Sequence, residues 1–192
     1  MPQFPSLPET AHLTDLLSRF PKTVQPLMAY TNAVLRTEGA LSMADRELIA
    51  AYVSGLNACT FCFGSHLIYA RALGVEEGVI EAMIADPASA GVKWAPLLEY
   101  LKKLNTLPSK LTPADAQAVL DAGWSEEALF EAIEVAGLFN MMNRIVEGAG
   151  VNFDYADAPE AHTVTPGDEA ALKDSYLRYG DKVAALAQSR QT

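Results

Sequence analysis

Residues 42–66 read SMADRELIAAYVSGLNACTFCFGSH, and this stretch predicts two consecutive helices. The Ser42 hydroxyl can cap free N–H groups at the start of the first helix, and Asp45 lies in its first turn, as in a weak capping box. We expect this helix to end near Leu56, where a short break lets Cys59 begin the second helix. The sequence therefore predicts two helices joined by a short break, the first capped by Ser42 and the second beginning at Cys59.

Segments of the same kind occur on both sides of this unit. Further helices are predicted at residues 11–19, 24–37, 76–84, 94–105, 115–121, 126–148 and 170–187. Glycine lies near the end of several segments, as is common at helix C-caps. No segment shows the period-2 alternation that is typical of a half-buried strand. The sequence therefore predicts an all-α fold.

The chain also carries a weak internal repeat. A serine-capped acidic turn followed by an apolar helix occurs at residues 42–56 and again at residues 125–147. We expect these two helices to pack as a pair in a helical bundle with two related halves. The second copy contains no cysteine, so only one half would carry chemistry.

Length and charge limit the classes of protein that the chain can represent. With 192 residues, half of them hydrophobic, a single domain spanning 1–192 is expected, with an irregular segment at 1–22 and a helical tail at 166–192. A formal net charge of −10 repels nucleic-acid phosphates and anionic membranes. Without a signal-like N-terminus or an apolar run of about 18 residues, we expect a cytoplasmic protein that binds neither nucleic acid nor membrane.

Both cysteines and one of the three histidines lie close together, at Cys59, Cys62 and His66. On a helix these positions fall within roughly 60° of one another, so two thiols and an imidazole share one face. At a helix start, free N–H groups and the helix dipole favour the thiolate, which is the reactive form of cysteine. In a reducing compartment, such a pair is more typical of catalysis or metal binding than of a structural disulfide.

Three interpretations of this cluster follow from the residues alone: a redox dithiol, a metal site, or inert packing of two small side chains. A zinc ion could take Cys59, Cys62, His66 and Glu47 as ligands. Structural zinc sites, however, usually draw a second Cys/His pair from another segment, and this chain has none. On composition alone, Glu47 is a solvated charge.

Other polar residues give weaker signals. His12 and His162 stand alone among polar or turn residues, so we interpret both as solvated surface histidines. Asn140, Asn143 and Arg144 interrupt the long apolar helix of the C-terminal half. They could reach an active site, or they could make helix-end or subunit contacts.

The cluster resembles the active-site segment of the AhpD-like family, within the alkylhydroperoxidase and carboxymuconolactone decarboxylase superfamily. Redox members of that family carry Glu, eleven residues, Cys-x-x-Cys, three residues and His, and Glu47, Cys59, Cys62 and His66 reproduce both spacings. Further matching motifs are LSMADRE at 41–47, GWSEE at 123–127 and FNMMNR at 139–144. The likeness spans roughly residues 20–155 and is to the uncharacterised peroxidase-related branch. The best-studied members have a histidine between the cysteines, where this chain has Phe61.

The resemblance implies an AhpD-like helical bundle and a cysteine-dependent alkyl hydroperoxide reductase that needs no cofactor or metal. Cys62 would attack a small hydroperoxide and Cys59 would form a disulfide with it, while His66 acts as base and Glu47 relays protons. A lipoyl-bearing or thioredoxin-like protein would restore the dithiol. The family also implies a homo-oligomer.

Two other functions stay open at this point. One is a lyase of the carboxymuconolactone decarboxylase type, which shares the fold but typically lacks the paired cysteines. The other is a non-enzymatic regulator in which the same dithiol switches conformation. We predict that Tyr52, Phe61, Phe63 and Tyr69 form aromatic walls of a pocket around His66 and Glu47.

Overall fold

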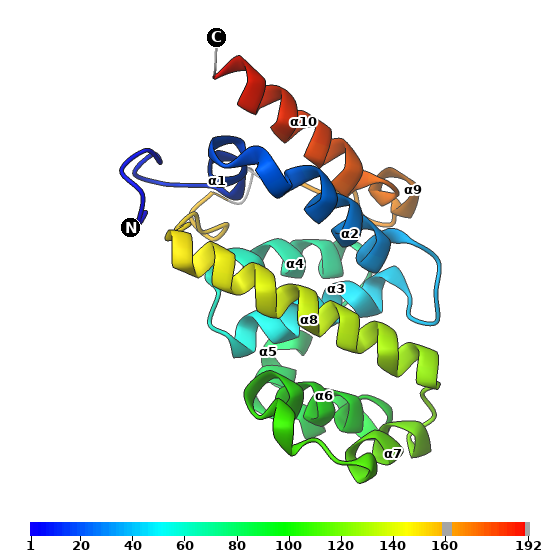
Figure 1. Ribbon diagram of the computed structural model, residues 1–192. Coiled ribbons are helices and arrows are strands. Elements are labelled where there is room, and N and C mark those ends of the chain that lie inside the picture. Colours follow the sequence, from blue (N-terminus) through cyan, green and yellow to red (C-terminus); the bar gives the residue numbers. More distant parts are fainter. Residues whose placement is uncertain (159–162, 191–192) are drawn as a thin grey trace.

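The computed structural model describes residues 1–158 and 163–190 (Figure 1). The α-helices are α1 (Leu13–Arg19), α2 (Val24–Arg36), α3 (Met43–Leu56), α4 (Thr60–Ala72), α5 (Val79–Ala85), α6 (Gly91–Thr106), α7 (Pro113–Asp121), α8 (Glu126–Ala149), α9 (Glu169–Leu172) and α10 (Ser175–Ser189). Short 3₁₀ helices are η1 (Pro21–Thr23), η2 (Pro87–Ala90) and η3 (Pro108–Lys110). The described ranges contain no strand, which confirms the predicted all-α fold.

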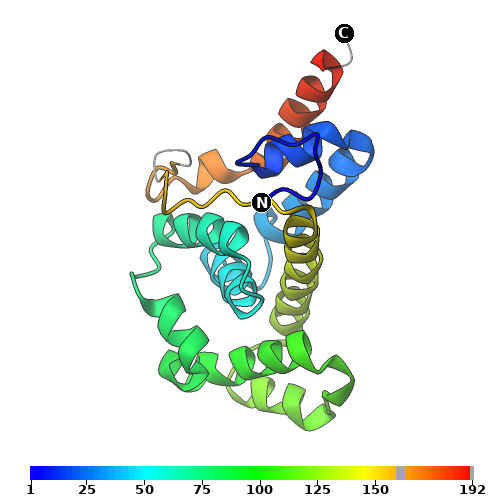
Figure 2. The ribbon, with the colours of Figure 1, turned by 90° about the vertical axis from the view of Figure 1, so that its left-hand side faces the viewer.

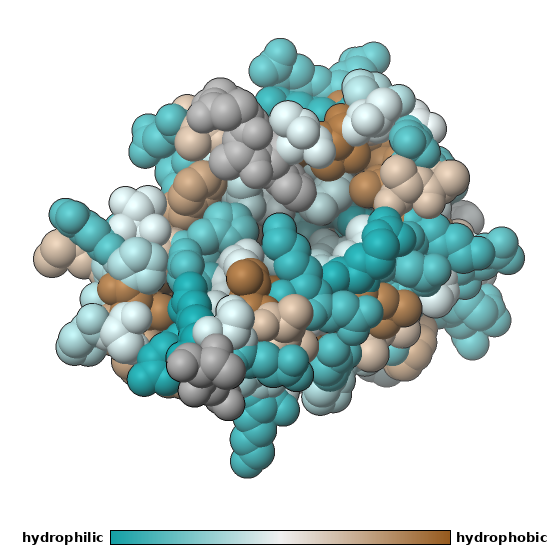
Figure 3. Space-filling model, turned by 90° about the horizontal axis from the view of Figure 1, so that it is seen from above, coloured by the Kyte–Doolittle hydropathy of each residue, from teal (hydrophilic) through white to brown (hydrophobic). Residues whose placement is uncertain are grey.

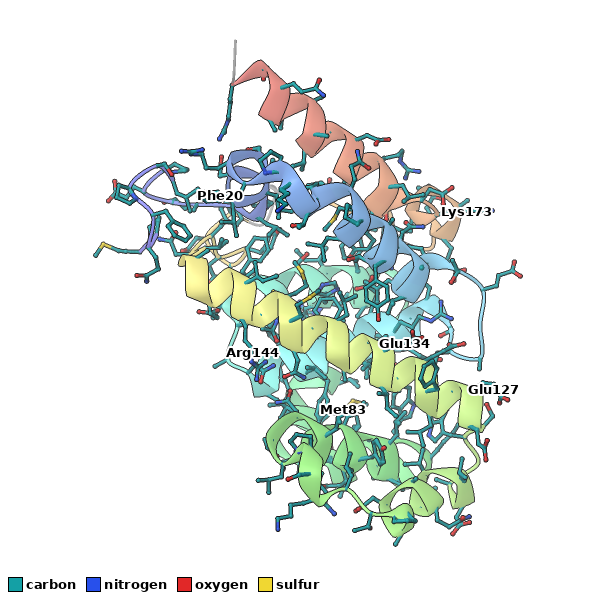
Figure 4. The ribbon with its side chains drawn as sticks, viewed as in Figure 1. Phe20, Met83, Glu127, Glu134, Arg144 and Lys173 are labelled. Carbon is teal, nitrogen blue, oxygen red and sulfur yellow. The ribbon has the colours of Figure 1, made fainter. Side chains whose placement is uncertain are left out.

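The helices form three tiers (Figures 1 and 2). The upper tier holds α1, α2, α9 and α10, the middle tier α3, α4 and α8, and the lower tier α5, α6 and α7. In Figure 4, Phe20 and Lys173 mark the upper tier, Met83 the lower tier and Glu127 the first turn of α8. The main apolar core joins the middle tier to the lower one, and a second cluster around the cysteines joins it to the N-terminal segment.

The break between α3 and α4 places the cysteines at a helix start. α3 begins with a capping box in which the Ser42 hydroxyl accepts a hydrogen bond from the Asp45 N–H at 3.1 Å, and the Asp45 carboxylate accepts one from the Ser42 N–H at 3.0 Å. After Leu56 the chain passes through Ala58, whose φ of 53° lies in the left-handed region. This turn lets Cys59 become the N-cap of α4, as predicted.

The two helices of the internal repeat, α3 and α8, pack against each other, as predicted. Ser125 caps α8, since its hydroxyl accepts a hydrogen bond from the Ala128 N–H at 3.1 Å. Fully buried Ala132 and Ala136 on α8 allow a close approach between helices. A hydrogen bond of 3.1 Å from the Asn143 amide to the Ser54 hydroxyl also joins the pair.

The tail is divided, whereas the sequence predicted one helix from residue 170 to residue 187. α9 ends at Leu172, and Asp174 adopts a φ of 58° before α10 begins. The break is held by side-chain hydrogen bonds to α2, from Asn32 to Asp174 at 3.4 Å and from Arg36 to Ser175 at 3.2 Å. A local pattern could not reveal a break that depends on contacts with another helix.

α10 lies close along α2 (Figure 1). The approach is closest at Gly180, where an added Cβ would lie 3.0 Å from the Cβ of Met28. Glycine therefore permits a helix spacing at this point that a larger residue would not. Through this contact α10 packs against α2 within the upper tier.

The outer face of the upper tier is mostly hydrophilic, and its hydrophobic residues form small separate patches (Figure 3). Across the described ranges, every helix is too short or too polar to span a bilayer.

Candidate active site

A cavity of about 270 Å³ lies between the upper and middle tiers. Its walls come from α1, α2, α4, α8 and α10 and from the segment that follows α8. Cys62 and His66 both line this cavity, whereas Cys59 and Glu47 are buried behind its surface. The predicted site residues are therefore brought to one place, but only two of the four face the space that a ligand could occupy.

The two cysteines differ in their surroundings. Cys59 is the N-cap of α4 and is fully buried, while Cys62 lies in the first turn of that helix and is 3% exposed. Both are free thiols. A hydrogen bond with Cys62 and burial raise the pKa of Cys59. The expectation that the helix start favours a thiolate is therefore wrong for Cys59, because pairing and desolvation outweigh the helix dipole.

His66 is held by Glu47. The His66 Nδ1 lies 2.6 Å from the Glu47 Oε2, and the carboxylate is fully buried. An ionised carboxylate can only accept, so we assign the ring proton to Nδ1, which leaves Nε2 as the acceptor in the neutral imidazole. The edge-to-face contact of the ring with Phe139, at 4.2 Å between centroids, fixes the orientation further. The base is thus positioned before any ligand arrives.

Arg36 completes this group, although no sequence pattern indicated its role. Its Nη1 lies 2.5 Å from the Glu47 Oε1, and both side chains are fully buried. The guanidinium also lies over the rings of Tyr69 and Tyr176, at 5.1 and 4.9 Å from their centroids. Burial raises the pKa of Glu47, but Arg36 and His66 lower it more, so the pKa lies below its ordinary value. Glu47 is therefore ionised in the core of the protein.

Replacing Arg36 with methionine should strongly destabilise the fold, because Glu47 would be left as a buried charge without its main partner. Removing one partner of a buried pair typically costs about 3–5 kcal/mol. Urea unfolding should show this loss as a lower free energy of unfolding. Arg71→Met is the matched control, since Arg71 pairs with Glu77 at the surface and such pairs contribute about 1 kcal/mol or less. Equal effects of the two substitutions would contradict the role assigned to Arg36.

His12 is not a solvated surface residue, contrary to the sequence interpretation. It is the N-cap of α1, where its Nδ1 accepts a hydrogen bond from the Thr14 N–H at 3.1 Å. It also lines the cavity, with Nε2 at 3.1 Å from the Tyr155 hydroxyl and its ring against Phe61. Burial lowers the pKa of His12, although Asp15 partly offsets this. The other histidine of that interpretation, His162, lies outside the described residues.

Asn140, Asn143 and Arg144 do not line the cavity. They belong to a chain of side-chain hydrogen bonds: from Asn57 to Asn143 at 2.9 Å, from Asn105 to Asn57 at 2.9 Å, from Asn140 to Asn105 at 2.6 Å and from Arg144 to Asn140 at 2.7 Å. This chain ties α6 and α8 to the turn that precedes Cys59. Of the roles considered, the structure thus favours one at the end of α3 over direct contact with a ligand.

The aromatic walls of the cavity differ in part from those predicted. Phe61 and Tyr69 line it, but Tyr52 and Phe63 pack with the main core instead. The remaining aromatic walls come from segments distant in sequence and are Phe139, Tyr155, Tyr176 and Tyr179. Their positions depend on the tail and on the segment after α8, for which no spacing rule relates them to the cysteines.

No metal site is assembled in the part of the chain that the structure describes. There, no group of three or more His, Cys, Asp or Glu side chains is arranged to hold an ion. The two oxygens of Glu47 face Arg36 and His66 instead. The four residues considered as zinc ligands therefore lie close together without forming an arrangement that could hold an ion.

Comparison with known proteins places this chain in a family. Residues 21–103 match the carboxymuconolactone decarboxylase family. The uncharacterised protein YdfG of Bacillus subtilis (strain 168) is 30% identical over 112 residues, which cover 56% of this chain and 75% of that protein. The chain belongs to the carboxymuconolactone decarboxylase family.

Two solved structures share the fold. One is the AhpD core of an uncharacterised peroxidase-related protein from Ralstonia eutropha JMP134, with a TM-score of 0.66 and 19% identity over 85% of this chain and 79% of that chain. The other is an uncharacterised peroxidase-related protein from Silicibacter sp. TM1040, with a TM-score of 0.61 and 24% identity over 65% of this chain and 66% of that chain. The AhpD-like bundle predicted from the sequence is thereby confirmed.

Proposed function

We propose that this protein is a cysteine-dependent hydroperoxide reductase in which Cys62 is the nucleophile. The observation that carries the proposal is that Cys62 and His66 line one cavity, while Glu47 holds the His66 ring at 2.6 Å. A nucleophile, a neighbouring base and a group that orients the base are the parts that an activated thiol requires. Membership in a family that includes alkylhydroperoxidases supports the same conclusion.

In the first step, the His66 Nε2 takes the proton of the Cys62 thiol. The two residues are four positions apart on α4 and are neighbours on one helix face, whereas Cys59 is seven positions, or about 10.5 Å of helix rise, from His66. The Cys62 thiolate attacks the terminal oxygen of the hydroperoxide and the O–O bond breaks. The thiol becomes a sulfenic acid and the hydroperoxide leaves as an alcohol.

In the second step, Cys59 resolves the sulfenic acid. Its sulfur attacks the Cys62 sulfur, the S–O bond breaks, and the departing hydroxide takes the Cys59 proton and leaves as water. In the resting state, the raised pKa keeps Cys59 protonated, so that its thiol can donate a hydrogen bond to the Cys62 sulfur. An external dithiol, lipoyl-bearing or thioredoxin-like, then reduces the disulfide.

The cavity favours a small organic hydroperoxide. A volume of about 270 Å³ corresponds to roughly nine water molecules at about 30 Å³ each. Most of its walls are aromatic or apolar, with Met28 and Met142 among them. A compact apolar substituent next to the peroxide group fits such a space better than a charged chain does.

Peroxide should be consumed over many turnovers when the protein is supplied with dihydrolipoamide. Mass spectrometry of the protein alone after mild peroxide should show the loss of two hydrogens, as an intramolecular Cys59–Cys62 disulfide forms. A protein with both cysteines replaced by serine provides the blank. Formation of the disulfide without repeated turnover would support a redox sensor and contradict the enzyme.

A further inference from the structure

The cavity holds a second pair of proton-carrying groups that the steps above do not use. His12, at the start of α1, and Tyr155, after α8, both line it, and the His12 Nε2 lies 3.1 Å from the Tyr155 hydroxyl oxygen. Tyr155 packs on α4, where its ring lies 5.5 Å from that of Phe61. The Ser65 hydroxyl is a further hydrogen-bonding neighbour of the phenol. The pair thus adjoins the helix that carries Cys62.

The direction of the His12–Tyr155 hydrogen bond follows from the helix cap. The His12 Nδ1 accepts the Thr14 N–H, and a backbone N–H can only donate. In the neutral ring, the proton is therefore on Nε2, which donates to the Tyr155 oxygen. His12 therefore polarises the phenolic O–H of Tyr155 and does not compete for its proton. Burial lowers the pKa of His12, which favours the neutral ring.

Hydroperoxide reduction needs a proton at a second place. His66 removes a proton from Cys62, but the alkoxide that leaves when the O–O bond breaks must gain one. Its conjugate acid, an alcohol, is about as weak an acid as water. Burial raises the pKa of Tyr155 to about 12, so the phenol is protonated at neutral pH and is still a stronger acid than the alcohol. Proton transfer from Tyr155 to the alkoxide is therefore favourable.

We propose that Tyr155 is the general acid that protonates the leaving alkoxide, and that His12 is a positioning residue that holds and polarises it. The inference rests on the proposed function. As the Cys62 sulfur forms its bond to the terminal oxygen, the other oxygen takes the proton of Tyr155 and leaves as alcohol. The phenolate then regains a proton, through solvent, from the His66 ring that received the thiol proton. One thiol and one hydroperoxide thus give one sulfenic acid and one alcohol.

The choice of oxidant tests this assignment. tert-Butyl hydroperoxide releases an alkoxide, which needs a general acid, whereas peracetic acid releases a carboxylate, whose conjugate acid has a pKa of only about 4–5. Rapid-mixing measurements of Cys62 oxidation should show Tyr155→Phe slowed roughly 10²- to 10⁴-fold with the hydroperoxide. With the peracid the variant should be slowed far less. The ratio of the two rate constants is the readout, because mere damage to the site would lower both.

Two further variants sharpen the test. His12→Asn keeps a good helix N-cap but cannot reach Tyr155, and it should lower the hydroperoxide-to-peracid ratio by about tenfold, the worth of one hydrogen bond to a charged group. Tyr30→Phe, at an exposed tyrosine on α2, should leave the ratio unchanged. If Tyr155→Phe slows both oxidants equally, or neither, the assignment of the general acid is wrong while the proposed function stands. A wild-type Cys62 that reacts with neither oxidant would instead overturn the proposed function, and this inference with it.

Discussion

The Cys62→Ser protein should lose the rapid reaction with hydroperoxides, while the Cys59→Ser protein should keep it. Cys62 lines the cavity beside the base, and Cys59 does not reach the cavity surface. A serine hydroxyl is a far weaker nucleophile than a thiolate, so we expect a decrease of roughly 10³-fold or more in the rate of peroxide reduction. The remaining thiol in that variant, Cys59, should stay mostly unmodified.

The roles of the two cysteines can be separated with a reagent that traps sulfenic acids. After peroxide treatment, the Cys59→Ser protein should carry the trapped adduct at Cys62, because no resolving thiol is left to remove it. Peptide mapping would locate the adduct. Faster oxidation of Cys59 than of Cys62 in these single variants would reverse the assignment.

The second large effect is expected for His66→Ala, which should slow the first oxidation of Cys62 by roughly 10²- to 10⁴-fold, the usual contribution of a general base. The Nε2 of His66 is the acceptor in the tautomer that Glu47 enforces, and no other histidine on α4 can replace it. Stopped-flow oxidation of the Cys59→Ser background would isolate this step. Free imidazole added to the solution should restore part of the rate, since the substitution leaves space in the cavity wall.

A negligible effect of His66→Ala would leave the histidine as a packing residue. In that case the ion-paired group behind it, Glu47 with Arg36, would have a structural role alone. Glu47→Gln provides an intermediate variant, because the amide can still accept from Nδ1–H but no longer carries the charge that stabilises an imidazolium. We expect its rate to lie between those of wild type and His66→Ala.

The part of the site that the sequence predicted depends on local rules. Ser42 and Asp45 set the start of α3, and the short distance from Leu56 to Cys59 leaves room only for a tight turn before the next helix. The shared face of Cys62 and His66 follows from helical spacing. Glu47 could be assigned to the site only from the family spacing, because a glutamate that follows Asp45 and Arg46 near the start of a helix otherwise indicates solvent exposure.

The remainder of the site depends on contacts between distant segments. Arg36 lies in the last turn of α2, where a basic residue is expected to face the helix dipole in solvent, but α10 and α4 close over it and bury it. His12 is a helix cap of a less common type, and Tyr155 lies in an irregular segment. Neither carries a spacing that relates it to the cysteines, so only the tertiary structure could bring them to the cavity.

The glycine that lets α10 lie against α2 also bears on selectivity. Gly180 does not contact the cavity, yet its neighbour Tyr179 and its contact partner Met28 both line it. The spacing between the α2 and α10 backbones thus affects the size of the cavity that Cys62 lines. A larger side chain at position 180 would wedge the helices apart and admit bulkier peroxides, while every reacting atom on α3 and α4 stayed in place. The preference for substrate size would then depend on position 180, and the reaction itself on residues of α3 and α4. A substitution could therefore change one without changing the other.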